Sequence, residues 1–125
     1  MERGQAALMG MQVMPNDSVV SITSVTSATV DANVTRTLKV FEQVVHCITG
    51  ATYTITVSLP SVAAAKGKFY TVKLITDNGQ NVTVQDQDDS YDWAATGDLT
   101  LSTATDFGIF FSDGHKWYEL QSQTT

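Results

Sequence analysis

Short runs in which apolar and polar residues alternate recur through the second half of this chain, and they restrict its fold more than any other feature. The clearest run covers residues 52–59. The others are residues 68–76, 80–86, 98–102 and 107–120. A period of two places successive side chains on opposite faces of a strand. The pattern therefore predicts an all-β domain, an antiparallel β-sandwich or short barrel of about eight strands with minimal helix.

The apolar faces of two of these runs are predicted to meet in the core. One face consists of Tyr53, Ile55, Val57 and Leu59. The other consists of Phe107, Ile109 and Phe111. Thr54 and the other threonines of the first run then face water, because they occupy the alternate positions.

Two segments carry turn signals of defined geometry. Asp77-Asn78-Gly79 separates two predicted strands, and Asn-Gly accepts the positive φ angles of a type I′ turn, so this segment predicts a hairpin. After Pro60, Ser61 can cap a single helical turn over residues 62–66, and Gly67 can end it in the left-handed conformation.

The length and charge of the chain exclude several classes of partner. Its 125 residues match one domain, and its formal net charge is −6 with seven scattered basic residues. Nucleic-acid binding requires a basic face that displaces counterions from phosphates, so no nucleic-acid partner is expected. Attraction to anionic lipid is disfavoured for the same reason. No apolar run is long enough for a transmembrane helix, so no membrane partner is expected.

Residues 1–17 differ in composition from the rest and are predicted to form an N-terminal arm ahead of a single β domain over residues 18–125. They hold all four methionines, and Gly4, Gly10 and Pro15 interrupt any regular element. Such a segment suits an extended arm on a neighbouring protein surface, and it also fits a disordered tail. The residues assigned to surface contact are Leu8, Met9, Met11, Val13 and Met14.

Residues 18–30 and 34–48 are sparsely charged runs with apolar residues on both strand faces. One small domain covers both faces of such strands poorly, so we expect a second subunit to cover one of them, in a homotrimer. The residues assigned to this subunit interface are Val20, Ile22, Val25, Phe41 and Val45.

The sequence offers few candidates for catalysis or metal binding. Cys47 is the only cysteine and lies in an apolar run, so it is expected to be a small buried hydrophobe. The neighbouring His46 points to the opposite strand face and is poorly placed as its base. With His115 as the only other histidine, a zinc site is not expected either. We predict no catalytic residue and no cofactor.

An acidic cluster is the one candidate metal site. Its carboxylates could ligate Ca²⁺ through oxygen, but the run lacks the sixth-position Gly and the twelfth-position Glu of an EF-hand loop. A solvated loop is therefore favoured, and no metal is expected. The cluster consists of Asp86, Asp88, Asp89 and Asp92.

The order of several landmarks resembles a layout recurrent in virion proteins of tailed phages. These landmarks are Leu59-Pro60, a small-residue turn closing on Gly67, an aromatic strand, an Asn-Gly turn, and Ser112-Asp113-Gly114 followed by Trp117. The resemblance is one of spacings and covers the C-terminal half. This layout of landmarks is found in capsid decoration proteins and in tail-fibre modules. It implies that Trp117 is a core or inter-strand residue and that the acidic loop bears no metal.

The function implied by this resemblance is that of a phage capsid decoration, or cement, protein. It would bind the major capsid protein at the virion surface and stabilise the head without catalysis. The alternative is a receptor- or glycan-binding module of a tail fibre, in which Tyr91, Trp93 and Trp117 would stack on sugar rings. A calcium-dependent hydrolytic or lectin domain is a third alternative. The single domain and arm-like start favour the decoration protein.

Overall fold

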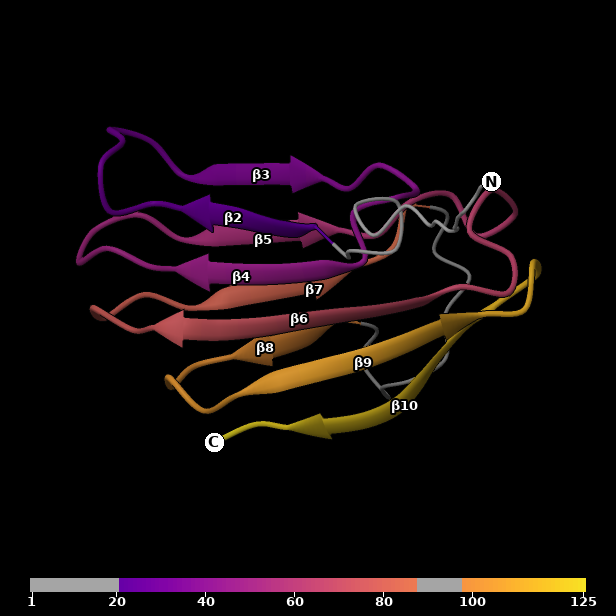
Figure 1. Ribbon diagram of the computed structural model, residues 1–125. Coiled ribbons are helices and arrows are strands. Elements are labelled where there is room, and N and C mark those ends of the chain that lie inside the picture. Colours follow the sequence, from indigo (N-terminus) through magenta and orange to yellow (C-terminus); the bar gives the residue numbers. More distant parts are fainter. Residues whose placement is uncertain (1–20, 88–97) are drawn as a thin grey trace, which may run out of the picture.

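All regular structure in the described part of the chain is β-structure, so the predicted all-β class is confirmed (Figure 1). The computed structural model describes residues 21–87 and 98–125. These residues form nine strands and no helix. The strands are β2 (Ile22–Thr26), β3 (Val34–Thr37), β4 (Val44–Ile48), β5 (Ile55–Ser58), β6 (Phe69–Thr76), β7 (Val82–Gln85), β8 (Leu99–Leu101), β9 (Phe107–Ser112) and β10 (Trp117–Gln123).

The strands form two open sheets with the hydrophobic core between them. The five-stranded sheet has the order β10-β9-β6-β4-β2, and the four-stranded sheet has the order β3-β5-β7-β8. From β2 to β7 the chain passes to the other sheet after every strand, and each strand pairs in parallel with the strand two places away. We call residues 22–85 the coil. Strands β8, β9 and β10 then join the sheets by antiparallel pairing, and we call residues 99–123 the antiparallel part.

The expectation of an antiparallel domain is wrong for the coil. Among the described strands, four of the seven pairings are parallel. Alternation records only that one face of a strand is buried, and a strand in a coil meets that condition as well as a strand in a hairpin. Because the coil's connections run between sheets, strands that are consecutive in sequence are not neighbours in a sheet.

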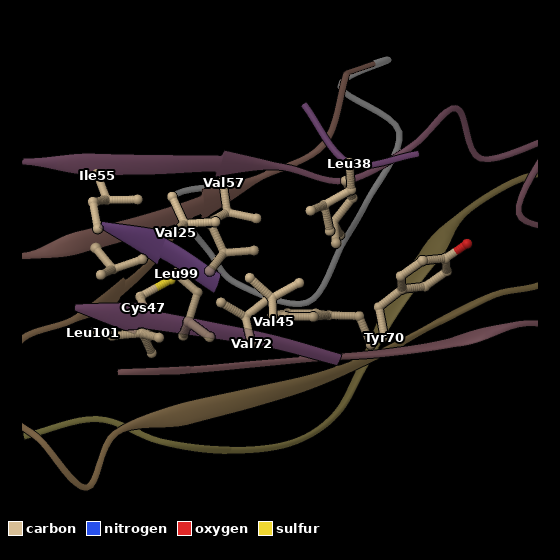
Figure 2. Packing of buried hydrophobic residues seen from close by; sticks show 14 of the residues in the cluster. Val25, Leu38, Val45, Cys47, Ile55, Val57, Tyr70, Val72, Leu99 and Leu101 are labelled. Carbon is tan, nitrogen blue, oxygen red and sulfur yellow. The ribbon is translucent and has the colours of Figure 1, made fainter. Parts of the chain in front are cut away.

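Pairing in the coil stacks similar side chains in rows across each sheet. One inward row of the four-stranded sheet consists of Val34, Ile55, Val82 and Leu101. One inward row of the five-stranded sheet consists of Val25, Cys47 and Leu74. Figure 2 shows the labelled side chains of the two sheets pointing toward one another across the core. The prediction that this face of the run lies inward is confirmed for Ile55, Val57 and Leu59, which are fully buried, whereas Tyr53 lies ahead of β5 and is half-buried.

The predicted hairpin at residues 77–79 is wrong. Strands β6 and β7 belong to different sheets, so this segment connects the two sheets. Gly79 does have a positive φ of 126°. The Asn78 side-chain amide donates a hydrogen bond of 2.8 Å to the carbonyl oxygen of Thr49. A turn is therefore present at this segment, but it packs on the β4–β5 connection instead of joining two paired strands.

Stacking of these connections explains the glycine at position 50. A Cβ on Gly50, in the β4–β5 connection, would lie 2.9 Å from the Cα atom of Ala28 and 2.9 Å from the carbonyl oxygen of Ser27, both in the backbone of the β2–β3 connection. The Ser27 hydroxyl accepts a hydrogen bond from the Gly50 backbone N–H (3.0 Å) and donates one to the carbonyl oxygen of Tyr53 (2.6 Å). The β2–β3 and β4–β5 connections are thus in backbone contact, and any side chain at position 50 would separate them.

The predicted inward face of β9 is wrong. The buried residues of this strand are Gly108, Phe110 and Ser112, whereas Phe107, Ile109 and Phe111 lie on the outer face. A Cβ on Gly108 would lie 2.6 Å from the Phe110 ring, so that ring occupies the space above the glycine. In a run of five residues with three aromatic rings, the alternation Phe-Gly-Ile-Phe-Phe does not identify the inner face. The glycine did carry the signal, because it leaves room for an inward ring.

The predicted helical turn after Pro60 is present as one turn. The Ala65 N–H donates to the carbonyl oxygen of Ser61 (3.0 Å), and Gly67 has a φ of +79°, the left-handed conformation expected of it. The turn is fixed to β9 because the Ser112 hydroxyl donates a 2.6 Å hydrogen bond to the carbonyl oxygen of Val62.

Candidate interaction surface

The outer face of the five-stranded sheet is the largest apolar feature on the described surface. Seven large hydrophobic residues of the described chain are exposed, and five of them belong to this sheet: Ile22, Phe69, Ile75, Tyr118 and Leu120. Half-buried apolar residues lie between them on the same face, namely Val44, Phe107, Ile109 and Phe111. We call these nine residues the apolar face. Thr71, His46 and Lys73 lie among them on the same face. Exposed apolar residues gathered on one face of a domain mark sites of protein interaction.

Aromatic contacts hold the apolar face together. The Phe69 and Phe111 rings lie 4.8 Å apart between centroids, across the β6–β9 pair. The Lys73 Nζ atom lies 5.7 Å from the centroid of the Phe107 ring, within the range of a cation–π contact. Phe69 nevertheless remains 53% exposed. The rings are therefore ordered by one another while still offering area to a partner.

The outer face of the four-stranded sheet has the opposite chemistry. One threonine from each strand aligns in a single row, and the row consists of Thr35, Thr56, Thr83 and Thr100. Threonine suits exposed strand positions because its branched Cβ fits a pleated surface and its hydroxyl stays hydrated. The outward threonines expected in the run that contains Thr54 thus have counterparts in every strand of this sheet. We call this the threonine face.

The residues predicted to contact a capsid or another subunit lie in three kinds of place. The arm residues Leu8, Met9, Met11, Val13 and Met14, together with Val20, lie outside the described residues. Ile22 (59% exposed) and Phe41 (62% exposed) are on the surface. Val25 and Val45 are buried in the chain's own core, where they pack between the two sheets (Figure 2). Sequence reasoning assigned Ile109 and Phe111 to the core and gave Phe69 no role in an interaction surface.

A carboxylate bridges the two sheets at the first turn of the coil. Glu42 forms an ion pair with Arg36 of β3 and accepts a hydrogen bond from the Thr23 hydroxyl of β2 (3.1 Å) and from the Lys39 N–H (2.9 Å). Burial alone would raise the pKa of Glu42, but these hydrogen bonds and the Arg36 charge hold it below its usual value. Its role is to close the end of the core between β2 and β3.

Asp106 forms the most extensive polar cluster of the described chain. Its fully buried carboxylate accepts hydrogen bonds from the N–H groups of Ser102, Thr103 and Thr125 and from the Thr103 and Thr125 hydroxyls. Burial alone would raise the pKa of Asp106, but these hydrogen bonds, led by that of Thr125, hold it well below its usual value. The cluster ties residues that follow β10 to the β8–β9 connection. Sequence reasoning missed it because Ser, Thr and Asp in a loop look alike whether solvated or buried.

The groups considered for catalysis or metal binding lie apart from one another. Cys47 is fully buried, and burial raises the pKa of its thiol to about 12, so it behaves as the expected hydrophobe. His46 lies on the opposite face of β4, as predicted, and His115 is exposed in the β9–β10 turn. Within residues 21–87 and 98–125, no three His, Cys, Asp or Glu side chains gather as a metal site would require. Asp86 is buried, and the rest of the acidic cluster lies outside the described residues.

Of the three aromatic residues considered for sugar stacking, Trp117 is the one that lies in the described part of the chain. Trp117 is fully buried and meets the Tyr70 ring edge-on, with centroids 5.4 Å apart, which agrees with the core position implied by the resemblance. Tyr91 and Trp93 lie outside the described residues. Tyr118 is exposed, and its hydroxyl donates to the Asp113 carboxylate (3.0 Å).

Comparisons with protein-family models, curated proteins and solved structures gave no match to this chain. In the described ranges, no helix is long and apolar enough to cross a membrane.

Proposed function

We propose that this chain is a virion structural protein, a phage capsid decoration protein that binds the head surface and stabilises it without catalysis. The observation that carries the proposal is the apolar face: an acidic domain displays an ordered aromatic and aliphatic surface on one sheet and a hydrated threonine surface on the other. A domain with one adhesive side and one wet side suits assembly with neighbouring subunits in a protein shell. The order of landmarks in the C-terminal half supports the same proposal.

The proposal assigns different tasks to different parts of the chain. The domain is a two-layered β-sandwich that acts as a rigid body and assembles as a homotrimer. The arm residues Leu8, Met9, Met11, Val13 and Met14 contact the major capsid protein. Ordering a flexible arm on binding costs conformational entropy, so the arm contributes affinity only by burying its methionine and leucine side chains. The described polar clusters at Glu42 and Asp106 serve stability in this scheme.

Attachment to heads is the direct test. Phage heads assembled without the protein are mixed with the purified chain and pelleted, and the bound fraction is measured over a concentration series. We expect saturable binding and greater resistance of the heads to heat or to loss of salt. A variant lacking residues 1–14 should keep its β-structure by circular dichroism and bind heads more weakly. A chain that never pellets with heads, and instead binds soluble glycans, would favour the tail-fibre alternative.

A further inference from the structure

We infer that the apolar face is covered by a second copy of this chain, so that the contact between subunits is made by the outer face of the five-stranded sheet. The inference replaces the predicted interface over residues 18–30 and 34–48 and rests on the homo-oligomeric part of the proposed function. Of the residues first assigned to that interface, Ile22 belongs to the apolar face, whereas Val25 and Val45 are buried within the chain.

The area and order of the face argue that it is covered. Exposed aliphatic and aromatic residues extend from Ile22 at one edge strand, through Phe69 in the middle of the sheet, to Tyr118 and Leu120 at the other edge strand. Each such side chain is stabilised when its exposed part moves from water into a packed contact. The threonine face offers no comparable gain, because burying its hydroxyls without new hydrogen bonds costs free energy.

Charge decides in favour of a second copy as the occupant. The chain has 13 acidic and seven basic residues, so two copies repel each other at long range. The five strands of this sheet contain one carboxylate, Glu119, and it lies on the inner side, paired with buried Phe110. Lys73 is the only permanently charged side chain on the outer side. Asp113, in the β9–β10 turn, places a single carboxylate at one end of this face, where it accepts the Tyr118 hydroxyl hydrogen bond. A strongly basic partner would be matched by several carboxylates across the contact, whereas a face with one carboxylate at its margin suits a partner that carries the same net charge.

A pair of matched variants tests the inference. Phe69→Glu adds a carboxylate to the apolar face, and Thr35→Glu adds the same charge to an exposed strand position on the threonine face. Both proteins, and the wild type, are examined by sedimentation equilibrium over a hundredfold range of concentration. We expect the wild type and Thr35→Glu to associate alike, and Phe69→Glu to associate at least about tenfold more weakly, the effect of losing one central apolar anchor and adding repulsion.

Two further measurements keep the test decisive. Circular dichroism establishes that Phe69→Glu is folded; should it unfold, Tyr118→Glu takes its place at the exposed edge strand. Head binding is measured in parallel for all variants. A folded Phe69→Glu that associates as tightly as the wild type overturns the inference alone. A wild type that binds heads as a monomer overturns the inference and the homotrimer, and leaves head binding standing. A wild type that associates through this face but does not bind heads overturns the proposed function alone.

Discussion

The coil and the antiparallel part are built from the same kind of sequence and differ in how each strand finds its neighbour. In the coil, β4 pairs with β2 and β6, each separated from it by a strand of the other sheet. In the antiparallel part, β9 pairs with β10 across a short turn at Asp113 and Gly114. Alternation sets which face of a strand is buried, and the connections decide direction. The two regions therefore differ in the connections between their strands. Substitutions should destabilise them for different physical reasons.

Loss of an inward ring in the antiparallel part should have the largest effect. Phe110→Ala removes a fully buried ring that lies over Gly108, and replacing a buried Phe with Ala costs about 3–5 kcal/mol. Phe111→Ala is the matched control, because Phe111 is the next residue and lies on the outer face. Urea denaturation at one low protein concentration measures both. Equal losses for the two variants would contradict the assignment of the faces of β9.

In the coil, a substitution that pushes two stacked connections apart should have the next largest effect on stability. Gly50→Ala places a methyl group 2.9 Å from backbone atoms of Ser27 and Ala28, and overpacking of this kind costs about 1–3 kcal/mol. Gly67→Ala is a useful comparison, since it has open space around its Cβ position but a positive φ of 79°. Thermal unfolding followed by circular dichroism compares them. A Gly50→Ala protein as stable as the wild type would show that the coil connections do not need backbone contact.

Acid should destabilise the antiparallel part through Asp106. The pKa of this carboxyl is lower in the folded chain than in the unfolded chain, so the ionised form stabilises the fold. That contribution is complete above the unfolded pKa of about 4 and is lost as the pH falls from there toward the folded pKa. Asp106→Asn should cost about 1.5–3 kcal/mol at pH 7, the value of hydrogen bonds to a charged group. Below pH 4 the difference between the two proteins should shrink. A difference that stays constant from pH 7 to pH 2 would contradict this role.

Truncation on the threonine face should have the smallest effect. Thr54→Ala removes the hydroxyl of a half-buried residue that lies just ahead of β5 and alternates with its inward side chains, and substitutions outside the core change stability by less than about 0.5 kcal/mol. Val57→Ala, on the inner side of the same strand, is the control and should cost about 1–3 kcal/mol more. Chemical denaturation of the two variants distinguishes them. Comparable losses of stability in the two variants would contradict the assignment of the inner and outer faces of β5.

The sequence predicted burial well wherever one face of a strand is uniformly aliphatic. Ile55, Val57 and Leu59 were assigned correctly because threonine or serine occupies the alternate positions. Alternation did not identify the inner face of β9, because apolar residues occupy both faces and only Gly108 distinguishes them. Strand direction was not predictable from alternation, since a coil and a hairpin bury strands in the same way.

The candidate surface was predictable only in part for the same reason. Ile22 was identified as an interface residue, but Phe111 was assigned to the core, because phenylalanine is most often buried. Phe69 alternates with the inward residues of its strand and is exposed, although no interface role was predicted for it. The Asp106 cluster depends on Thr125, which is 19 positions away, so no local pattern reveals it. Polar contacts between distant segments require the fold to be known.

The winding of the coil has a consequence for how the chain is made. Ladder partners in the coil are between 21 and 28 positions apart, as between Val34 and Ile55 or Ile48 and Thr76. A nascent chain leaves the ribosome from its N-terminal end, so when β4 emerges its partner β2 is already free, and the same holds for each later strand up to β7. Every added strand can dock on one synthesised two strands earlier without waiting for distant sequence. The antiparallel strands come last and close the sheets, so a stalled ribosome would display a partly wound coil with its newest edge open to other chains.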